Sequence, residues 1–391
     1  MKSKWITATI DDVCTVVTDG AHNSPKSVEE GHYMASVKDF TEFGFDFSNC
    51  KQIGKEDYEK LRNQGCVPEK NDILVGKDGA RYFEDIIIYK QDERPALLSS
   101  IAILRADSRK ITPEFLYYTL KSPAVRKDVR ENYGSGSAIP RIVLKDFKRM
   151  PFSFPSIEEQ RKITNLCSAI DAKIQVNNAI NENLEQQAQS LFIEMFDSKE
   201  SNFWKQGVLS DIAEITMGQS PSGNSYNENG QGTVFFQGRA EFGFRFPTIR
   251  LFTSEPKRIA QKNDTLMSVR APVGDLNVAH EECCIGRGLA AIHSKDNHQS
   301  FVHYTMFSLQ RELDVFNGEG TVFGSINRNA LNSMPIRVPP IDLMDKFENI
   351  ASPIDKLIRT NFDENCHLQA IRDSILPKLM AGEIDLSNFK L

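Results

Sequence analysis

The residues best suited to metal chemistry are two histidines and two cysteines between positions 280 and 293. His280, Cys283, Cys284 and His293 offer the nitrogen and sulfur atoms that zinc prefers, but their spacing fits no zinc template. We therefore expect thiols buried in a strand rather than a metal site. The chain has seven cysteines, an odd number, and they are scattered. This pattern is typical of reduced thiols and favours a cytoplasmic protein.

No other set of side chains forms a recognisable catalytic or cofactor site. The chain lacks the Gly-x-x-x-x-Gly-Lys-Ser/Thr loop that cradles phosphates. The glycine-rich stretches at 134–136 and 318–324 lack the spacing and the preceding strand of a dinucleotide fingerprint. We therefore expect a binding and scaffolding protein with no catalytic residue, metal or cofactor of its own. An enzyme with an unrecognised site is the alternative, and methylation by the purified chain alone would support it.

The net charge of −6 is distributed unevenly along the chain. Residues 157–203 carry −4 and residues 341–391 carry −3, so the parts between them are close to neutral. Two local basic runs stand out: residues 121–149 hold eight basic and three acidic side chains, and residues 239–270 hold seven and three. These runs are compatible with phosphate contacts, although a charged run is also what an ordinary solvated face contains.

The element that must position everything else is a long helix predicted from position 157 to about 198. This stretch contains no glycine or proline. About 40 helical residues would form a rod of roughly 60 Å. Apolar side chains fall at alternating spacings of three and four, which is typical of a helix that packs lengthwise on another helix. They are Ile163, Leu166, Ile170, Ile180, Leu184 and Leu191.

The partner helix is predicted in the same chain, because the seam recurs after a shift of 184 residues. We expect the two helices to pair antiparallel through ten residues: Ile163, Leu166, Ile170, Asn177, Leu184, Ile350, Ile354, Leu357, Asn361 and Leu368. Asn177 and Asn361 are equivalent and polar. Because a buried polar residue fixes register at a cost in stability, changing both to leucine is expected to raise the melting temperature. Pro353 is expected to break or kink the second helix, so that its long continuous part begins there.

The repeat extends to the segments between the helices, which Trp5 and Trp204 open. Each segment contains several β-rich runs, then a helix and a glycine-rich loop. One of the β-rich runs ends at a break, which lies at 76–81 in the first segment and at 270–274 in the second. The predicted fold is α+β, with two pseudo-repeated mixed α/β domains separated by two long antiparallel coiled-coil helices. The predicted boundaries are 1–154 for the first domain, 155–200 for the central helix, 201–339 for the second domain, 340–382 for the distal helix and 383–391 for a tail.

Several short motifs occur in the same order in both halves. The first half has Asp19-Gly20-Ala21-His22, Asp72-Ile73-Leu74-Val75, Lys77-Asp78-Gly79-Ala80, Ser137-Ala138-Ile139-Pro140-Arg141 and Glu158-Glu159-Gln160. The second half has Gly218-Gln219-Ser220-Pro221, Ser268-Val269-Arg270-Ala271-Pro272-Val273-Gly274-Asp275 and Ile285-Gly286-Arg287-Gly288-Leu289. With the two heptad helices, this plan resembles the specificity subunit of Type I restriction-modification systems. The resemblance covers nearly the whole chain and departs from the family pattern at residues 342–344, where Glu-Glu-Gln is usual.

The resemblance implies that each mixed domain is a target recognition domain that reads one half of an asymmetric, bipartite site in double-stranded DNA. The helices would be the spacer between the two readers. The chain would bind two modification (methyltransferase) subunits, and the complex would recruit restriction (translocase/nuclease) subunits. S-adenosylmethionine, ATP and Mg would then be bound by those partners rather than by this chain.

Base reading is expected from polar side chains on loops, with lysine and arginine on phosphates. The candidate DNA contacts are Lys77, Asp78, Arg81 and His22 in the first domain and Arg239, Arg245 and Arg270 in the second. His22 could equally fix its own turn, and Arg287 is expected to hold a strand or loop.

Two other readings of the plan stay open. A coiled-coil adaptor with no DNA role would explain the heptads but not the two motif sets, and salt-dependent binding to duplex DNA would separate the two functions. A specificity subunit whose partner fuses methyltransferase and nuclease would share all of these features. The sequence does not give the DNA target, its spacer length or the methylated base.

Overall fold

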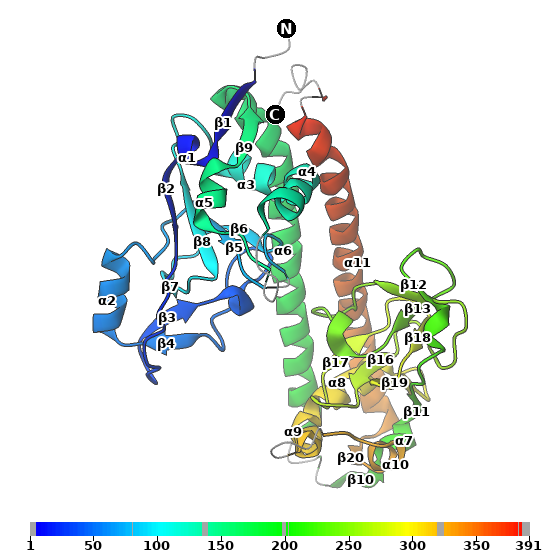
Figure 1. The fold of residues 1–391 in the computed structure, drawn as a ribbon. Helices are drawn as coiled ribbons and strands as arrows, with labels where there is room; N and C mark the ends of the chain where they lie inside the picture. Colours follow the sequence, from blue (N-terminus) through cyan, green and yellow to red (C-terminus); the bar gives the residue numbers. More distant parts are fainter. Residues whose placement is uncertain are drawn as a thin grey trace. The chain divides into compact units, whose positions relative to one another are not determined.

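The chain forms two compact units, and both long helices belong in part to each. The computed structural model describes residues 5–79, 81–134, 140–197, 201, 203–318, 324–381 and 383–384. Most of the expected tail at 383–391 and the loop residues 135–139 and 319–323 lie outside this set. The first unit is Met1–Asn177 with Asp363–Leu391, and the second is Asn178–Phe362. The division therefore cuts α6 (Ile157–Phe196) and α11 (Ile341–Met380), both visible in Figure 1.

The first unit combines a four-stranded sheet with a three-stranded sheet and short helices. Its strands are β1 (Ile6–Thr9), β2 (Cys14–Asp19), β3 (His32–Ala35), β4 (Lys51–Ile53), β5 (Ile73–Gly76), β6 (Ile86–Ile88), β7 (Ala96–Leu97), β8 (Ile101–Ala106) and β9 (Pro151–Phe154). Its helices are α1 (Ile10–Val13), α2 (Lys55–Asn63), α3 (Pro113–Lys121), α4 (Pro123–Asp128) and α5 (Leu144–Arg149). The sheet orders are β2-β8-β5-β6, β4-β3-β7 and β1-β9.

Strand β5 is buried on both faces, which explains its unbroken apolar run. Successive side chains of a strand point to opposite faces of the sheet. Ile73 and Val75 enter a core that also contains Phe115 of α3, whereas Leu74 enters a second core with Leu97 of the three-stranded sheet. The four-stranded sheet is therefore the middle layer, with α3 on one face and the smaller sheet on the other.

The second unit repeats this plan. Its strands are β10 (Lys205–Val208), β11 (Ala213–Met217), β12 (Tyr226–Asn227), β13 (Thr233–Phe236), β14 (Leu251–Thr253), β15 (Ile259–Ala260), β16 (Thr265–Ser268), β17 (Leu276–Val278), β18 (Cys283–Ile285), β19 (Leu289–Ser294) and β20 (Pro335–Val338). Its helices are α7 (Leu209–Ile212), α8 (Gln299–Ser308), α9 (Gln310–Asp314) and α10 (Arg328–Asn332). The sheet order β11-β19-β16-β17 matches β2-β8-β5-β6, and the larger sheet is β12-β14-β13-β18-β15.

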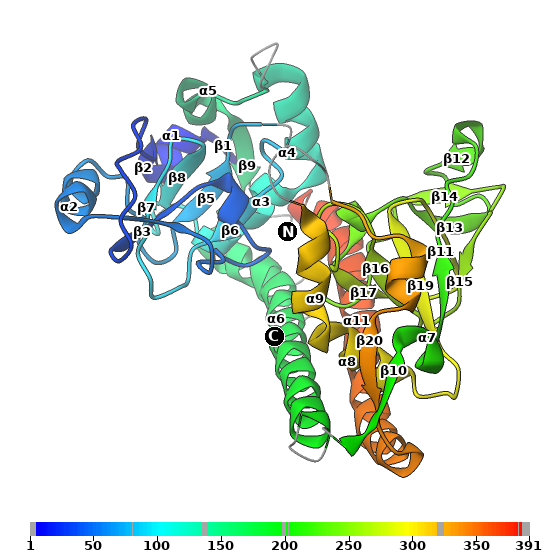
Figure 2. The same cartoon turned by 90° about the horizontal axis from the view of Figure 1, so that it is seen from below.

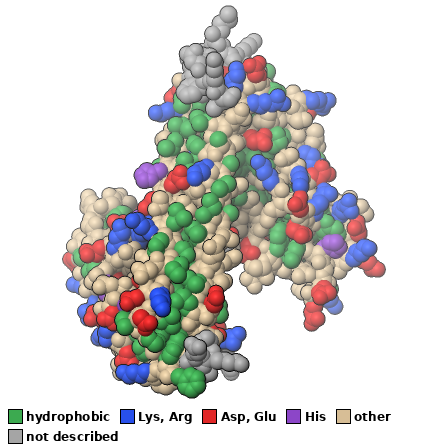
Figure 3. Space-filling view, turned by 180° about the vertical axis from the view of Figure 1, so that it is seen from behind, with side chains coloured by type: hydrophobic (Ala, Val, Ile, Leu, Met, Phe, Trp, Pro, Cys, Tyr) green, Lys and Arg blue, Asp and Glu red, His purple; other side chains and the backbone are tan. Residues whose placement is uncertain are grey.

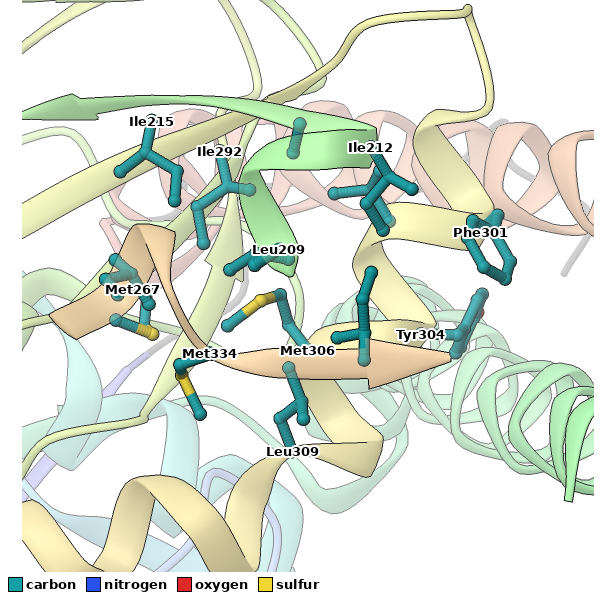
Figure 4. Close-up of a cluster of buried hydrophobic side chains, with 14 of the residues drawn as sticks. Leu209, Ile212, Ile215, Met267, Ile292, Phe301, Tyr304, Met306, Leu309 and Met334 are labelled. Carbon is teal, nitrogen blue, oxygen red and sulfur yellow. The ribbon is translucent and has the colours of Figure 1, made fainter. Parts of the chain in front are cut away.

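The cores of the second unit lie on both faces of its four-stranded sheet. Met267 and Ile292 belong to the same core as Phe301 and Tyr304 of α8 on one face (Figure 4), and Phe347 of α11 is part of it too. Leu266 and Leu289 meet residues of the five-stranded sheet on the other face. Seen from below in Figure 2, strands β12 to β15 lie at the outer edge of this unit, farther from α11 than β16 and β17. The loop between β13 and β14 of the larger sheet contacts the helices through Arg245 and Phe246.

Two mixed α/β domains and two long helices are therefore confirmed, but one detail of the second helix is wrong in the sequence-based prediction. Helix α11 continues without a break from Ile341 to Met380. Pro353 is exposed. Its ring therefore lies on the side of the helix that faces water. The carbonyl group one turn earlier, which receives no amide donor from the proline, lies on the same side. An interior proline is best tolerated there. None of the helices in the described part of the chain is long and apolar enough to cross a membrane.

Candidate nucleic-acid interface

A cluster of loops forms at one end of the four-stranded sheet in the first unit. Gly20 follows β2, and its amide donates to the carbonyl of Ile101 at 3.1 Å. Any side chain here would collide with the loop before β8, because a Cβ on Gly20 would lie 2.2 Å from the carbonyl oxygen of Leu97. The amide of Lys77, just after β5, donates to the carbonyl of Ser100 at 2.8 Å. The sheet therefore brings three loops that are distant in sequence into contact.

Lys77 holds this cluster together rather than facing outward. Its side chain is buried, and its ammonium group lies 3.3 Å from the Asp19 carboxylate and 3.8 Å from that of Asp78. The charge of Lys77 is therefore balanced inside the loop cluster, and the predicted DNA contact would require it to leave Asp19. His22 is 75% exposed, with Nε2 at 3.4 Å from Asp19.

Asp78 and Arg81 lie nearer the surface. Asp78 forms an isolated β-bridge with Arg141, and one of its carboxylate oxygens is buried without a hydrogen-bond partner in the described part of the chain. Arg81 is 76% exposed and donates to both carboxylate oxygens of Asp85, an interaction that raises the pKa of the guanidinium. Both side chains are positioned to meet a ligand, although Arg81 would first have to leave Asp85.

The second unit builds the same cluster with different side chains. Gly218 lies against Gly286, since a Cβ there would be 2.1 Å from its carbonyl oxygen. Arg287 is exposed while its backbone amide donates to Ser220 Oγ at 3.3 Å. Arg270 occupies the place of Asp78: it follows the equivalent strand and forms an isolated β-bridge with Ser325, which is 184 positions beyond Arg141.

The charges of the two clusters therefore differ. Arg270 and Arg287 are exposed, and neither forms an ion pair within the described ranges. Arg239 is half-exposed and pairs with Asp275. In the first unit the equivalent place carries the carboxylate of Asp78. The shared backbone frame thus presents a more positive surface in the second unit than in the first.

Arg245 has a structural role, so its predicted DNA contact is wrong. The side chain is only 5% exposed. It donates to Glu185 of α6 at 2.8 Å and to Asp355 of α11 at 2.5 Å, and its guanidinium lies over the ring of Tyr304. Burial raises the pKa of Glu185 even with Arg245 beside it. If Arg245 turned outward to reach DNA, two partly buried carboxylates would be left without their cation, which is unfavourable.

A repeated tyrosine–aspartate bond anchors each domain to its long helix. In the first unit Tyr118 of α3 donates to Asp171 of α6 at 2.6 Å, and Asp171 also accepts from Arg372 of α11 at 2.6 Å. In the second unit Tyr304 of α8 donates to Asp355 of α11 at 3.0 Å. The sequence analysis missed these anchors. The sequence could have indicated them, because Asp171 and Asp355 are related by the 184-residue shift.

The predicted apolar seam is shifted on the second helix. Ile350 is 50% exposed and Leu357 is 45% exposed, whereas the next residues, Ala351 and Ile358, are buried. Each long helix covers a domain as well as the other helix, so its buried face is set by both partners and not by a two-position seam. The expected interface is wrong at Ile350 and Leu357.

The other predicted interface residues are placed as follows. Ile163 is buried and Leu166 is partly buried, both against the first domain. Ile170 and Leu368 are half-buried, and Leu184 and Ile354 pack on a small cluster around Phe246. Asn177 and Asn361 form hydrogen bonds across the helix pair. Apolar side chains also remain exposed on the long helices. They are Val176, Ile180, Ile193, Ile341, Ile350, Leu357 and Ile371. Figure 3 shows hydrophobic side chains gathered along the long helices on one face.

Four asparagines form two equivalent amide pairs between the helices. In the first unit Asn177 Nδ2 donates to Asn365 Oδ1 at 2.8 Å, and in the second unit Asn361 Nδ2 donates to Asn181 Oδ1 at 2.8 Å. The 184-residue shift converts one pair into the other. Asn177, Asn181 and Asn365 are buried. Each pair therefore joins one asparagine of α6 to one of α11, Asn177 with Asn365 and Asn181 with Asn361.

The cysteines and histidines near β18 form no metal-binding group. Within the described residues, no three His, Cys, Asp or Glu side chains lie together as a metal site would require. Cys283 and Cys284 are buried in β18, and burial raises the pKa of Cys283 to about 12. His293 bonds to Asp264 at 2.6 Å instead. These side chains are part of the protein core and its hydrogen bonding.

A sequence profile described as Type I restriction modification DNA specificity domain matches residues 2–186 and again residues 202–369. The chain belongs to this family. The duplicated match coincides with the two repeats of the structure. The putative type I restriction enzyme MjaX specificity subunit of Methanocaldococcus jannaschii is 28% identical over 97% of this chain and 93% of its own length. The MjaIX specificity subunit of the same organism is 24% identical over 70% of this chain and 69% of its own length.

A solved structure supports the fold of this specificity subunit. The S subunit of a Type-I restriction-modification system from M. genitalium superimposes with a TM-score of 0.56 at 18% identity, covering 97% of this chain and 96% of the other. At that level of identity the likeness concerns the fold alone. It shows that two mixed domains joined by long helices are an architecture of specificity subunits.

Proposed function

We propose that this specificity subunit binds double-stranded DNA at an asymmetric, bipartite target, with one domain on each half-site. The observation that carries the proposal is the loop cluster, which has the same backbone arrangement in both units but different side chains in each. Arg270 stands where the first unit has Asp78. An arginine suits guanine or a phosphate, whereas a carboxylate accepts from cytosine N4. Two readers with opposite charges at one position favour two different half-sites.

The chemistry of the loop residues assigns them different proposed roles. Asp78, Arg270 and Arg287 are exposed or half-buried at the loop cluster and are proposed to contact DNA directly. Arg239 and Arg81 are paired with acids and are proposed to reach phosphates by exchanging those partners. His22 is proposed to lie at the edge of the same surface. Lys77 is proposed to support these residues from beneath through its bond to Asp19.

We further propose that the chain has no catalytic activity by itself and assembles with two modification subunits and with restriction subunits. S-adenosylmethionine, ATP and Mg would be bound by those partners. The exposed isoleucines and Leu357 on the long helices support partner binding, because a partner that covers them would remove apolar surface from water. The acidic helices make the isolated chain a poor match for DNA, so tight binding is expected only in the complex.

The experiment is to map methylated adenines across the genome of the host with the gene intact and deleted. The proposal expects one asymmetric motif, interrupted by a fixed number of unread bases, that loses its methylation when the gene is deleted. If every methylated motif persisted in the deletion strain, the chain would not be the specificity component. Purified complex with and without this chain, incubated with duplex DNA at several salt concentrations, provides the matching binding test.

A further inference from the structure

Each unit contains a small cavity at the same place in the repeat. In the second unit it measures about 310 Å³ and lies where α8, α11 and the ends of the sheet strands meet. In the first unit it measures about 300 Å³ and lies between α3 and α6. Ser352 and Asp355 line the former, and Ser168 and Asp171 line the latter, at a shift of 184 residues. The cavity of the first unit can therefore be compared residue by residue with the cavity of the second.

The two cavities differ in charge. Lys356 and Arg359 line the cavity of the second unit, where the first unit has Ala172 and Gln175. In all, four lysines and arginines and two carboxylates line the second cavity. The corresponding cavity contains one lysine, Lys90, and two carboxylates. Only the second unit therefore has an excess of positive charge at this site.

The two carboxylates of the second cavity already have partners. Asp355 accepts from Arg245 and from Tyr304. Glu348 accepts from the hydroxyl of Ser300 at 3.0 Å and from two backbone amides at the start of α8 at 3.2 Å. Lys356 is exposed at the cavity and forms no ion pair within the described residues. Its charge is therefore not compensated by the protein atoms around the cavity.

His303 also lines this cavity and contributes a buried nitrogen without a partner. Its Nδ1 lies 3.0 Å from Thr265 Oγ1, which itself accepts from Gln299 Nε2 at 3.3 Å. In the tautomer in which Thr265 donates to Nδ1, the hydrogen of the neutral ring sits on Nε2. That Nε2 has no hydrogen-bond partner in the described part of the chain. Burial and Arg245 lower the pKa of His303, so the ring is neutral.

We propose that this cavity of the second unit binds a small phosphate-type anion, which accepts the Nε2–H of His303 and is balanced by Lys356. A buried donor without an acceptor is costly, and a bound oxyanion removes that cost. Tyr117 stands at the place of His303 in the first unit, beside Ala172 and Gln175. The first cavity is therefore expected to bind no such anion.

The site is independent of base recognition, and a phosphate group could come from two sources. A cavity of about 310 Å³ is at the lower end of small-molecule sites and accommodates free phosphate or a small phosphate ester. A nucleic-acid backbone could alternatively place one phosphate at the cavity mouth. The shared chemistry is a phosphate oxygen that accepts from His303, and competition separates the two sources.

The test is isothermal titration of the full chain with inorganic phosphate, at an ionic strength held constant with sodium chloride. The expected result is one saturable site. Lys356→Ala, which copies the residue of the first unit, is expected to weaken binding at least about tenfold, the equivalent of 1.4 kcal/mol. Lys346→Ala is the control, because Lys346 is an exposed lysine of the same helix that does not line the cavity. It is expected to leave the affinity unchanged.

His303→Phe tests the donor itself, with circular dichroism and melting to show that the variant folds. Loss of binding in both His303→Phe and Lys356→Ala supports the site, and if His303→Phe fails to fold, Lys356→Ala decides. Absence of saturable binding, or equal weakening by Lys346→Ala, overturns the proposal. Displacement of phosphate by a short DNA duplex would assign the natural ligand to the backbone, and retention of phosphate would assign it to a free phosphate compound.

Discussion

The asparagine pairs give the sharpest test of how the helices hold their register. Asn177 and Asn365 form one pair, and Asn181 and Asn361 the other. Changing Asn177 and Asn361 to leucine removes one member of each pair and leaves a buried amide on the other side. The expectation from the sequence, that this double change raises the melting temperature, is therefore reversed by the pairing in the structure.

The size of the effect follows from the number of amides that lose a partner. A buried polar group left without its hydrogen bond costs about 1–3 kcal/mol. The Asn177→Leu/Asn361→Leu protein is expected to lose about 2–6 kcal/mol of unfolding free energy, because two pairs are broken. Replacing one complete pair, Asn177→Leu/Asn365→Leu, leaves no amide of that pair behind. The hydrogen bonds of Asn177 to Lys173 and Glu364 are lost both here and in the single change Asn177→Leu. The double replacement is expected to cost much less than the sum of its two single changes.

The assay is a double-mutant cycle by urea unfolding, followed by circular dichroism. The pair Asn177 and Asn365 is expected to show a coupling energy of at least about 1 kcal/mol, within the range for contacting residues. Asn177 and Asn361 lie in different units and serve as the control, so their effects are expected to add. Additive effects for Asn177 and Asn365, or a more stable Asn177→Leu/Asn361→Leu protein, would refute the assigned pairing.

Three further perturbations test separate parts of the structure. Arg245→Ala is expected to destabilise the chain by about 3–5 kcal/mol in urea unfolding, since two partly buried carboxylates lose a fully buried cation. A change below about 1 kcal/mol would contradict this network. Arg270→Ala is expected to leave the melting temperature unchanged. If Arg270 contacts a phosphate, the change also reduces by about 1 the slope of log binding constant against log salt concentration for DNA binding by the assembled complex. Unaltered affinity and an unaltered target motif would exclude Arg270 from the interface. At pH 8, where the raised pKa of about 12 leaves Cys283 protonated, iodoacetamide is expected to label the exposed Cys366 first, as read by mass spectrometry. Equal labelling of Cys283 in the folded chain would contradict its burial.

The repeat made the architecture predictable from sequence. Heptad spacing and a 184-residue shift identify two long helices and two similar domains without any knowledge of contacts. The shift even relates Asp171 to Asp355, so the anchors could have been found by asking which polar residues recur. The loop cluster was predictable as a place, because the motifs after β2 and β5 recur after β11 and β16.

Individual side-chain roles were less predictable, because composition does not reveal burial. Arg245 lies in a basic run that resembles a phosphate-binding surface, yet it is an interior cation between two helices. Lys77 likewise follows a strand in a loop motif but is neutralised by Asp19. Ile350 and Leu357 fit a two-position seam, whereas the helix packs on two partners at once. Pro353 lies inside α11 without ending it, and its side chain is exposed to water.

The central claim, that each domain reads its own half of a bipartite target, is tested most directly by domain replacement. Residues 1–154 are replaced by the equivalent domain of a related specificity subunit with a different target, and methylated adenines are mapped in cells that carry the modification subunit. The account predicts that one half of the methylated motif changes while the other half and the number of unread bases stay the same. A change in both halves together would contradict separate readers.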